Sequence, residues 1–228
     1  MHLSKILGVA AVLAASFATS QAHAVLIGTP GTGPAFSQPF SANPGGLYQQ
    51  VYAQELFTEG SVRITSLSFF TSSVPPTPVG SGTYTLSLSS TARGIDGLED
   101  GRLTGETPAL TVFNSNLGSD NTVVFSGALP AVSAGRLTFA LTSAFTYNPN
   151  VGPLLLDVRS TGSNTPAVLF RGTEEGVELT SRLIVTNNSA TAQQFGLVTD
   201  ITTVPEPMTA ALLGAGLLGL AGLRRRGA

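Results

Sequence analysis

The chain has no cysteine and no tryptophan, and it is almost without lysine and histidine. Its only lysine, Lys5, and both of its histidines, His2 and His23, precede Val25. From Val25 onward the chain has no thiol, imidazole or ammonium side chain. Those groups form Ser-His-Asp and Cys-His catalytic sites, Schiff-base lysines and the usual zinc sites. The sequence therefore excludes these classes of site, and it also excludes a fold held together by disulfides.

Basic residues are too few and too scattered for nucleic-acid binding. Between residues 25 and 204 there are seven arginines and twelve acidic residues, a net charge of −5, and the arginines occur singly. Binding to a phosphate backbone needs clustered positive charge. We therefore expect no DNA or RNA partner.

The C-terminal residues have the composition of a membrane segment. Val204-Pro205-Glu206-Pro207 leads into residues 208–223, which carry no charge, and Arg224-Arg225-Arg226 follows. A helix of this length extends about 24 Å, slightly less than a hydrocarbon core of about 30 Å. Arginines stay on the cytoplasmic side of a membrane, so the rest of the chain would be held outside.

A Pro-Glu-Pro start, a short apolar helix and a terminal arginine cluster resemble the PEP-CTERM sorting signal of Gram-negative bacteria that secrete exopolysaccharide. The resemblance implies that an exosortase reads the motif Val204, Pro205, Glu206 and Pro207 and cuts near it. The helix would then anchor the protein in the inner membrane only transiently, with Arg224, Arg225 and Arg226 as the cytoplasmic retention cluster. An ordinary C-terminal anchor that is never cut is the alternative.

The first 24 residues have the features of a secretory signal peptide. Lys5 precedes an apolar stretch at residues 6–18, and Ala22-His23-Ala24 provides the small-x-small pattern that signal peptidase prefers. We expect Ala22 and Ala24 to form the signal peptidase site and the mature chain to begin at Val25. A retained N-terminal helix is the alternative, although the apolar run is short for a membrane span.

Short segments between these two signals have the residue pattern of β-strands. Apolar and hydroxylated residues alternate in segments 83–89 and 136–142, as in strands with one face on a core and one in water. Segments 109–113 and 122–125 are rich in β-branched and aromatic residues, which favours strands. Further candidates are 48–56, 62–71 with a bulge near Ser66, 154–159, 167–171, 182–186 and 195–203.

This number of strands, separated by Gly, Pro, Asn and Asp turns, predicts an all-β fold. We expect an antiparallel β-sandwich of jelly-roll type, with an open barrel as the alternative. The predicted organisation is a signal peptide at 1–24, a β-sandwich domain at 25–201, a linker with the Pro-Glu-Pro motif at 202–207, and a transmembrane sorting helix with the arginine cluster at 208–228.

The body also resembles small PEP-CTERM proteins of unknown function, in which Tyr-Gln-Gln-Val-Tyr, Phe-Thr-Tyr-Asn-Pro and Leu-Leu-Leu-Asp-Val segments recur. These lie here at residues 48–52, 145–149 and 154–158. The resemblance implies membership and no activity. From the residues alone we expect Tyr48 and Tyr52 to be half-buried, a turn at 145–149, and Asp157 to face solvent or pair with an arginine.

Carboxylates are densest in the loop that contains Asp96, Glu99 and Asp100. Carboxylates alternating with glycines provide the oxygen ligands that Ca²⁺ prefers, so these three residues are candidate calcium ligands. Their spacing does not match the EF-hand pattern. A solvated turn without metal is the alternative, and we expect no other cofactor.

Two further groups of residues have the chemistry of sugar sites. Glu174, Glu175 and Glu178 offer paired carboxylates of the kind that hydrolyse glycosidic bonds, but an exposed hairpin tip between Phe170 and Leu179 is the favoured interpretation. Sugars also stack on aromatic rings, and the chain has four tyrosines near hydroxyl-rich strands, Tyr48, Tyr52, Tyr84 and Tyr147. Hydroxyl-rich strand faces are equally expected of any soluble sandwich without lysine.

Taken together, these features predict an exported, non-catalytic cell-surface or extracellular-matrix protein of a Gram-negative bacterium, sorted through a PEP-CTERM signal. Its expected partners are an exosortase-type processing enzyme, the inner membrane for a limited time, and exopolysaccharide. The alternatives are a secreted carboxylate-based glycoside hydrolase and a calcium-dependent carbohydrate-binding module.

Overall fold

The structure is a computed structural model that describes residues 21–40, 46–72, 82–101, 109–161, 168–174, 179–186 and 189–206. The chain divides into two units, Ala22–Val204 and a second formed by Met1–Gln21 and Pro205–Ala228. The first unit is the folded domain. The predicted signal peptide before Gln21 and the sorting segment from Pro207 onward lie outside the described residues.

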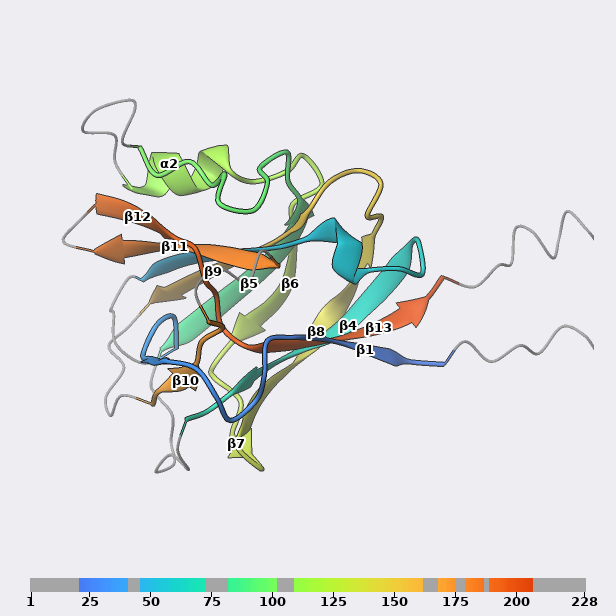
Figure 1. The fold of residues 1–228 in the computed structure, drawn as a ribbon, viewed down its shortest axis with the longest axis horizontal. Helices are drawn as coiled ribbons and strands as arrows, with labels where there is room; N and C mark the ends of the chain where they lie inside the picture. Colours follow the sequence, from blue (N-terminus) through green and yellow to red (C-terminus); the bar gives the residue numbers. More distant parts are fainter. Residues whose placement is uncertain are drawn as a thin grey trace, which may run out of the picture. The chain divides into compact units, whose positions relative to one another are not determined.

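Two curled antiparallel sheets form the domain, as Figure 1 shows. The five-stranded sheet has the order β1-β13-β4-β8-β7, with bounds His23–Ile27, Thr199–Pro205, Val62–Phe70, Arg136–Tyr147 and Val132–Ser133. The six-stranded sheet has the order β12-β11-β3-β9-β5-β6, with bounds Ser189–Gln193, Thr180–Thr186, Leu47–Tyr52, Leu154–Thr161, Thr83–Ser90 and Thr122–Gly127. A short pair joins β10 (Phe170–Arg171) to β2 (Ala35–Phe36). The predicted all-β, sandwich-like fold is confirmed.

Alternate residues of the strands fill the core between the two sheets. In β5 the side chains of Tyr84, Leu86 and Leu88 are fully buried in this core, as the alternating sequence predicted. The intervening Ser87 and Ser89 are also buried, on the opposite face of the same strand. The prediction that this face lies in water is therefore wrong for the second half of β5, because further chain covers it.

The helix α2 (Ala109–Ser115) packs on the outer face of this sheet and lies beside β12 and β11 in Figure 1. Its Val112 and Phe113 are buried in a second apolar cluster with Val51, Leu155 and Leu183 from the outer face of the six-stranded sheet. The prediction of a strand at 109–113 is wrong. Burial of Val112 and Phe113 against the sheet outweighs the preference of these residue types for strands.

Most other predicted strands are confirmed, with changed bounds. The bulge near Ser66 is confirmed, since the register of β4 against β8 shifts between Ile64 and Ser66. The strand predicted at 48–56 ends at Tyr52 and is followed by a 3-10 helix, Gln54–Leu56. The turn expected at 145–149 starts later, after β8 ends at Tyr147. The short or edge strands β1, β2, β7 and β12 were not predicted.

The predicted linker at 202–207 begins later than expected. Thr202, Thr203, Val204 and Pro205 are the last residues of β13, so they belong to the sheet and not to a free connection. Their neighbour β1 covers one side of β13, and β4 covers the other.

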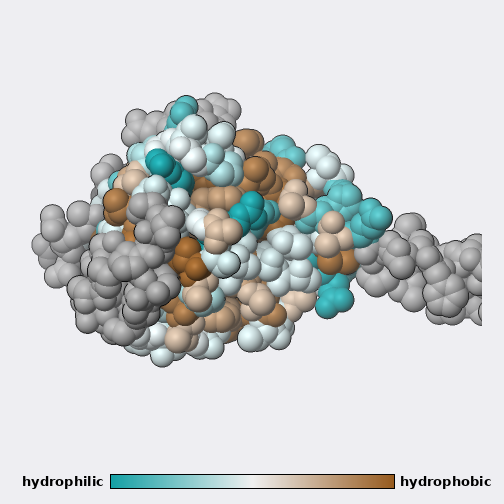
Figure 2. Space-filling model, turned by 90° about the horizontal axis from the view of Figure 1, so that it is seen from below, coloured by the Kyte–Doolittle hydropathy of each residue, from teal (hydrophilic) through white to brown (hydrophobic). Residues whose placement is uncertain are grey.

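Figure 2 shows one face of the molecule, on which hydrophobic and hydrophilic residues are intermixed. The exposed large hydrophobic side chains of the described residues come from separate segments: Leu26, Leu110, Val123, Val151, Leu169 and Leu179. No helix within the described residues is long and apolar enough to cross a membrane.

Candidate functional site

The first and last strands of the domain lie side by side. β1 and β13 pair in antiparallel register, with His23 opposite Thr203 and Ala24 opposite Thr202. The predicted signal peptidase residues Ala22 and Ala24 are exposed at the start of β1. Of the predicted sorting motif, Val204 and Pro205 end β13, Glu206 follows, and Pro207 lies outside the described residues together with Arg224, Arg225 and Arg226. The two predicted processing sites are therefore neighbours within the described part of the chain.

A cavity of about 350 Å³ lies beside this pair of strand ends. Its walls come from β1, from the segment around Phe57 and Glu59, and from Val62 and Thr203. The imidazole Nδ1 of His23 lies 3.3 Å from Oε1 of Glu59, with both side chains partly in solvent. The lining of the cavity combines this polar pair with apolar residues such as Leu56, Phe57 and Val62.

A second cavity, of about 290 Å³, brings together part of the predicted acidic site. Asp96 and Asp100 line it with Ser181, Gln193 and Gln194, and Leu98 and Ala192 complete the lining. The acidic loop is held against the sheet because the backbone N–H of Asp96 donates to Oγ of Ser181 at 2.9 Å. Asp96 has φ of 60°, a left-handed conformation that Asp tolerates better than most residues.

Glu99 has a different structural role from Asp96 and Asp100. Its carboxylate Oε1 accepts the backbone N–H of Gly101 at 3.0 Å, and its own N–H donates to Oδ1 of Asn116 at 2.9 Å. Among the described residues no group of three or more His, Cys, Asp or Glu side chains is arranged to hold a metal ion. The geometry therefore gives the calcium hypothesis no support, and the cavity has instead the carboxylates and amides that bind sugar hydroxyls.

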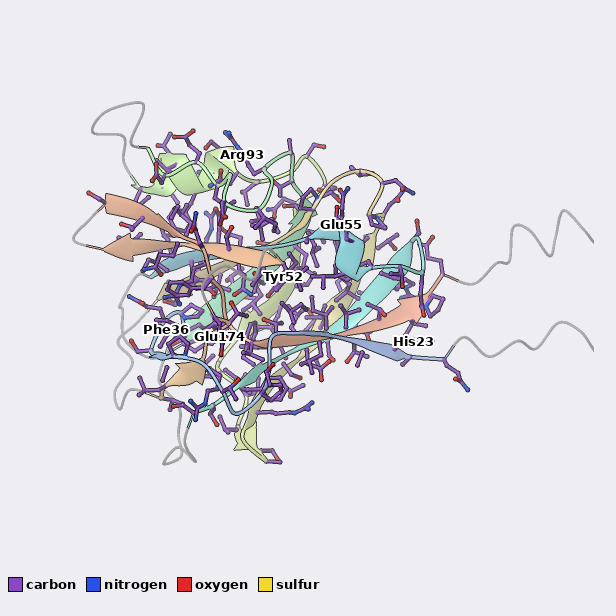
Figure 3. All side chains as sticks on the ribbon, viewed as in Figure 1. His23, Phe36, Tyr52, Glu55, Arg93 and Glu174 are labelled. Atoms are coloured by element: carbon purple, nitrogen blue, oxygen red, sulfur yellow. The ribbon has the colours of Figure 1, made fainter. Side chains whose placement is uncertain are left out.

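The other predicted sugar-binding residues are placed differently. Glu174 is exposed, and Glu175 and Glu178 lie outside the described residues. All four tyrosines are buried, so the prediction that Tyr48 and Tyr52 are half-buried is wrong and no tyrosine offers a ring for sugar stacking. In Figure 3 Tyr52 lies among the side chains between the sheets, while His23 lies at the far end of β1.

The buried tyrosines use their hydroxyls to tie the sheets to the loops. Tyr48 O–H donates to Oε1 of Gln50, and Gln50 in turn accepts the backbone N–H of Leu197 at 2.8 Å. The hydroxyl of Tyr52 lies 3.1 Å from Oγ1 of Thr199. Burial raises the pKa of Tyr48 to about 12 and raises that of Tyr52 as well. These residues therefore act in the packing of the domain.

A buried arginine is the main feature that the sequence did not predict. Arg182 of β11 is 1% exposed, and its Nε donates to Oε1 of Gln193 at 2.6 Å. Its guanidinium lies over the rings of Phe36 and Phe195, at 4.0 and 4.5 Å from the ring centroids. Burial lowers the pKa of Arg182, and the neighbouring Tyr48 opposes that shift. Its position among apolar residues at 183–185 is the one signal in the sequence for this burial.

Gln49 and Asp157 form a second buried polar group, under α2. Gln49 Nε2 donates to the carbonyl oxygen of Phe113 and to Oδ1 of Asp157, both at 2.8 Å. Arg159 Nε donates to Oδ2 of Asp157 at 2.8 Å, which confirms the predicted pairing of Asp157 with an arginine. Both glutamines of the Tyr-Gln-Gln-Val-Tyr segment are thus fully buried and structural.

Comparison with known proteins adds no assignment. No protein-family model matches the chain, and no curated protein is significantly similar to it. Any function must therefore be argued from the residue patterns and from the two cavities.

Proposed function

We propose that this chain is an exported, non-catalytic matrix protein of a Gram-negative cell surface, delivered by a C-terminal PEP-CTERM signal and associated with exopolysaccharide. The observation that carries the proposal is the pairing of β1 with β13, in which His23 lies opposite Thr203. When the first and last strands of a domain are adjacent, membrane segments at its two ends attach the domain to the membrane at a single position. Cutting near each segment then releases the domain without breaking into its core.

The proposed fold within the sandwich class is a jelly roll, and the strand order supports it. In the five-stranded sheet, the order β1-β13-β4-β8 pairs the first strand with the last. In the other sheet, the order β3-β9-β5-β6 interleaves early and late strands in the same way. Eight strands arranged as two interleaved Greek keys define a jelly roll. The hairpin β11-β12 extends the second sheet beyond β3 as an addition.

The proposed contact with exopolysaccharide is the cavity between the acidic loop and β12. It combines the carboxylates of Asp96 and Asp100 with the hydroxyl of Ser181 and the amides of Gln193 and Gln194. Planar polar groups of this kind accept and donate the paired hydrogen bonds that sugar hydroxyls offer. The described residues of the cavity lining include no aromatic ring, so we expect weak binding to each sugar segment.

The same cavity favours binding over hydrolysis. A glycoside hydrolase needs two carboxyl groups on opposite sides of the scissile bond. Asp96 and Asp100 come from one loop, and the residues from the sheet side are Ser181, Ala192, Gln193 and Gln194. Of the second acidic group, the described member, Glu174, lies exposed outside both cavities. We therefore place the carbohydrate-binding role ahead of the hydrolase.

Replacement of the sorting motif tests the proposal. In the host bacterium, Pro205, Glu206 and Pro207 would be changed together to alanine, and the mature mass and the location of the protein would be measured. We expect the variant to keep its C-terminal helix and to stay with the inner membrane, whereas the parent chain reaches the cell surface. An unchanged mass and an unchanged location would reject the sorting role.

A further inference from the structure

The residues opposite the end of β13 are the ones that signal peptidase would remove. Ala24 pairs with Thr202 and His23 pairs with Thr203, and both lie before the predicted cut that leaves Val25 as the first residue. The pairs that remain after this cut are those of Val25, Leu26 and Ile27 with residues 199–201. Removal of the signal peptide thus leaves one side of Thr202 and Thr203 without its strand partner.

The other side of β13 stays attached, which keeps this segment extended. Ser66 Oγ donates to Oγ1 of Thr202 at 2.8 Å, and β4 is the neighbour of β13 in the sheet. The chain from Thr202 to Pro205 is therefore not released as a flexible end. It becomes an edge strand, with backbone N–H and C=O groups turned toward the former position of His23 and Ala24.

The cavity beside β1 and β13 lies next to this edge of β13. His23 and Ala24 belong to its walls, and Thr203 at its border is only 1% exposed while they are present. The hydroxyl of Thr203 also donates to the carbonyl oxygen of His23 at 3.4 Å. Without His23 and Ala24, the lining residues that remain include Phe57, Val62 and Thr203.

We propose that the edge of β13 at Thr202 and Thr203, next to Val204, is the docking strand for the enzyme that cuts the sorting motif, and that removal of His23 and Ala24 uncovers it. This rests on the proposed function. The partner that fits is a processing enzyme that adds an extended strand of its own to the edge, because main-chain hydrogen bonds then supply affinity next to the bond to be cut. The precursor with its signal peptide attached is shielded, so N-terminal processing precedes C-terminal processing.

Blocking the first cut tests this order in the full chain in its host. Ala24→Leu places a bulky residue where signal peptidase needs a small one and keeps the pairing of β1 with β13. We expect the C-terminal cut, followed by mass spectrometry after a pulse of synthesis, to become about tenfold slower or to disappear. C-terminal cutting at the parental rate in chains that retain their signal peptide would overturn the proposal.

A second variant separates shielding from altered membrane attachment. His23→Pro combined with Ala24→Leu also keeps the signal peptide uncut, but proline cannot donate to the strand ladder and disfavours the pairing of this end of β1. We expect C-terminal cutting to recover in this double variant, and no recovery would overturn the proposal. The replacement of Pro205, Glu206 and Pro207 tests the sorting role separately. If it abolishes C-terminal cutting while both variants that keep their signal peptide are cut normally at the C-terminus, the sorting role stands and only the docking strand is rejected.

Discussion

The guanidinium of Arg182 lies 4.0 Å from the ring centroid of Phe36, inside the sandwich. Among the described residues, no carboxylate forms a salt bridge with this arginine. Oε1 of Gln193 accepts a hydrogen bond from Nε of Arg182. Nη1 of Arg182 is buried and has no hydrogen-bond partner among the described residues. Contact with the two phenyl rings and interaction with Tyr48 therefore supply much of the favourable interaction for this cation.

Replacement of Arg182 should separate packing from charge. We expect Arg182→Ala to lower the free energy of unfolding by about 2 to 4 kcal/mol, because it empties space beside Phe36 and Phe195 and leaves Gln193 without its donor. Arg182→Met should cost less, since it fills the space and removes a desolvated charge. Urea unfolding measures both, with the exposed Arg63→Ala as a control expected within about 0.5 kcal/mol of the parent. Equal losses for Ala and Met would contradict this account.

The buried tyrosines should make the domain sensitive to alkali. The pKa of Tyr48 rises from 10.0 to about 12 on folding, and that of Tyr52 also rises. The folded state then binds the phenol protons more tightly than the unfolded state does, so their contribution is complete below about pH 10 and is lost as the pH rises through the folded pKa.

We therefore expect the free energy of unfolding to be level up to about pH 9.5 and then to fall by about 1.4 kcal/mol per pH unit for each such tyrosine. Urea unfolding between about pH 8 and about pH 11.5 measures the slope. Tyrosinate absorbance from Tyr48 and Tyr52 should appear only together with the loss of β-structure in the circular dichroism spectrum. Titration of Tyr48 or Tyr52 near pH 10 in the folded protein would contradict this account.

The polar cavity should carry the contact with polysaccharide. We expect Asp96→Asn combined with Asp100→Asn to weaken retention on the host's own exopolysaccharide about tenfold, because each carboxylate accepts hydrogen bonds from sugar hydroxyls more strongly than an amide does. Co-sedimentation with the purified polymer measures the retention. Glu174→Gln, at an exposed acid outside the cavity, is the matched control and should bind as the parent does. Parental retention by the double variant would exclude this cavity as the contact.

The acidic loop should not depend on calcium. Oε1 of Glu99 already accepts the backbone N–H of Gly101, and the described residues form no group of three metal-binding side chains. We expect the melting temperature to be the same with excess Ca²⁺, with Mg²⁺ at the same ionic strength, and with a chelator. A saturable rise that only Ca²⁺ produces would restore Asp96, Glu99 and Asp100 as a calcium site.

Strands with a regular pattern were predictable because their alternation directly reflects one buried face. Tyr84, Leu86 and Leu88 in β5 are an example, and the change of parity around Ser66 correctly predicted a bulge. Local pattern failed at residues 109–113, where contact with the outer face of a distant sheet selects a helix. It also failed at β1, which pairs with a strand near the other end of the domain.

The candidate site was less predictable than the fold. Asp96 and Asp100 were found from local charge density, but Ser181 of β11 and Gln193 and Gln194 at the end of β12 line the same cavity from distant parts of the chain. The burial of Tyr48 and Tyr52 likewise depends on the packing of the two sheets against each other, which no local pattern contains. Only the pairing of β1 with β13 places the two predicted processing sites together, and no local pattern contains that register.

The intact mass of the protein released from the host surface tests the central claim most directly. The account predicts a single species that begins at Val25 and ends near Pro205, Glu206 or Pro207, without the residues from 208 onward. A surface species with the mass of the chain from Val25 to Ala228 would contradict it.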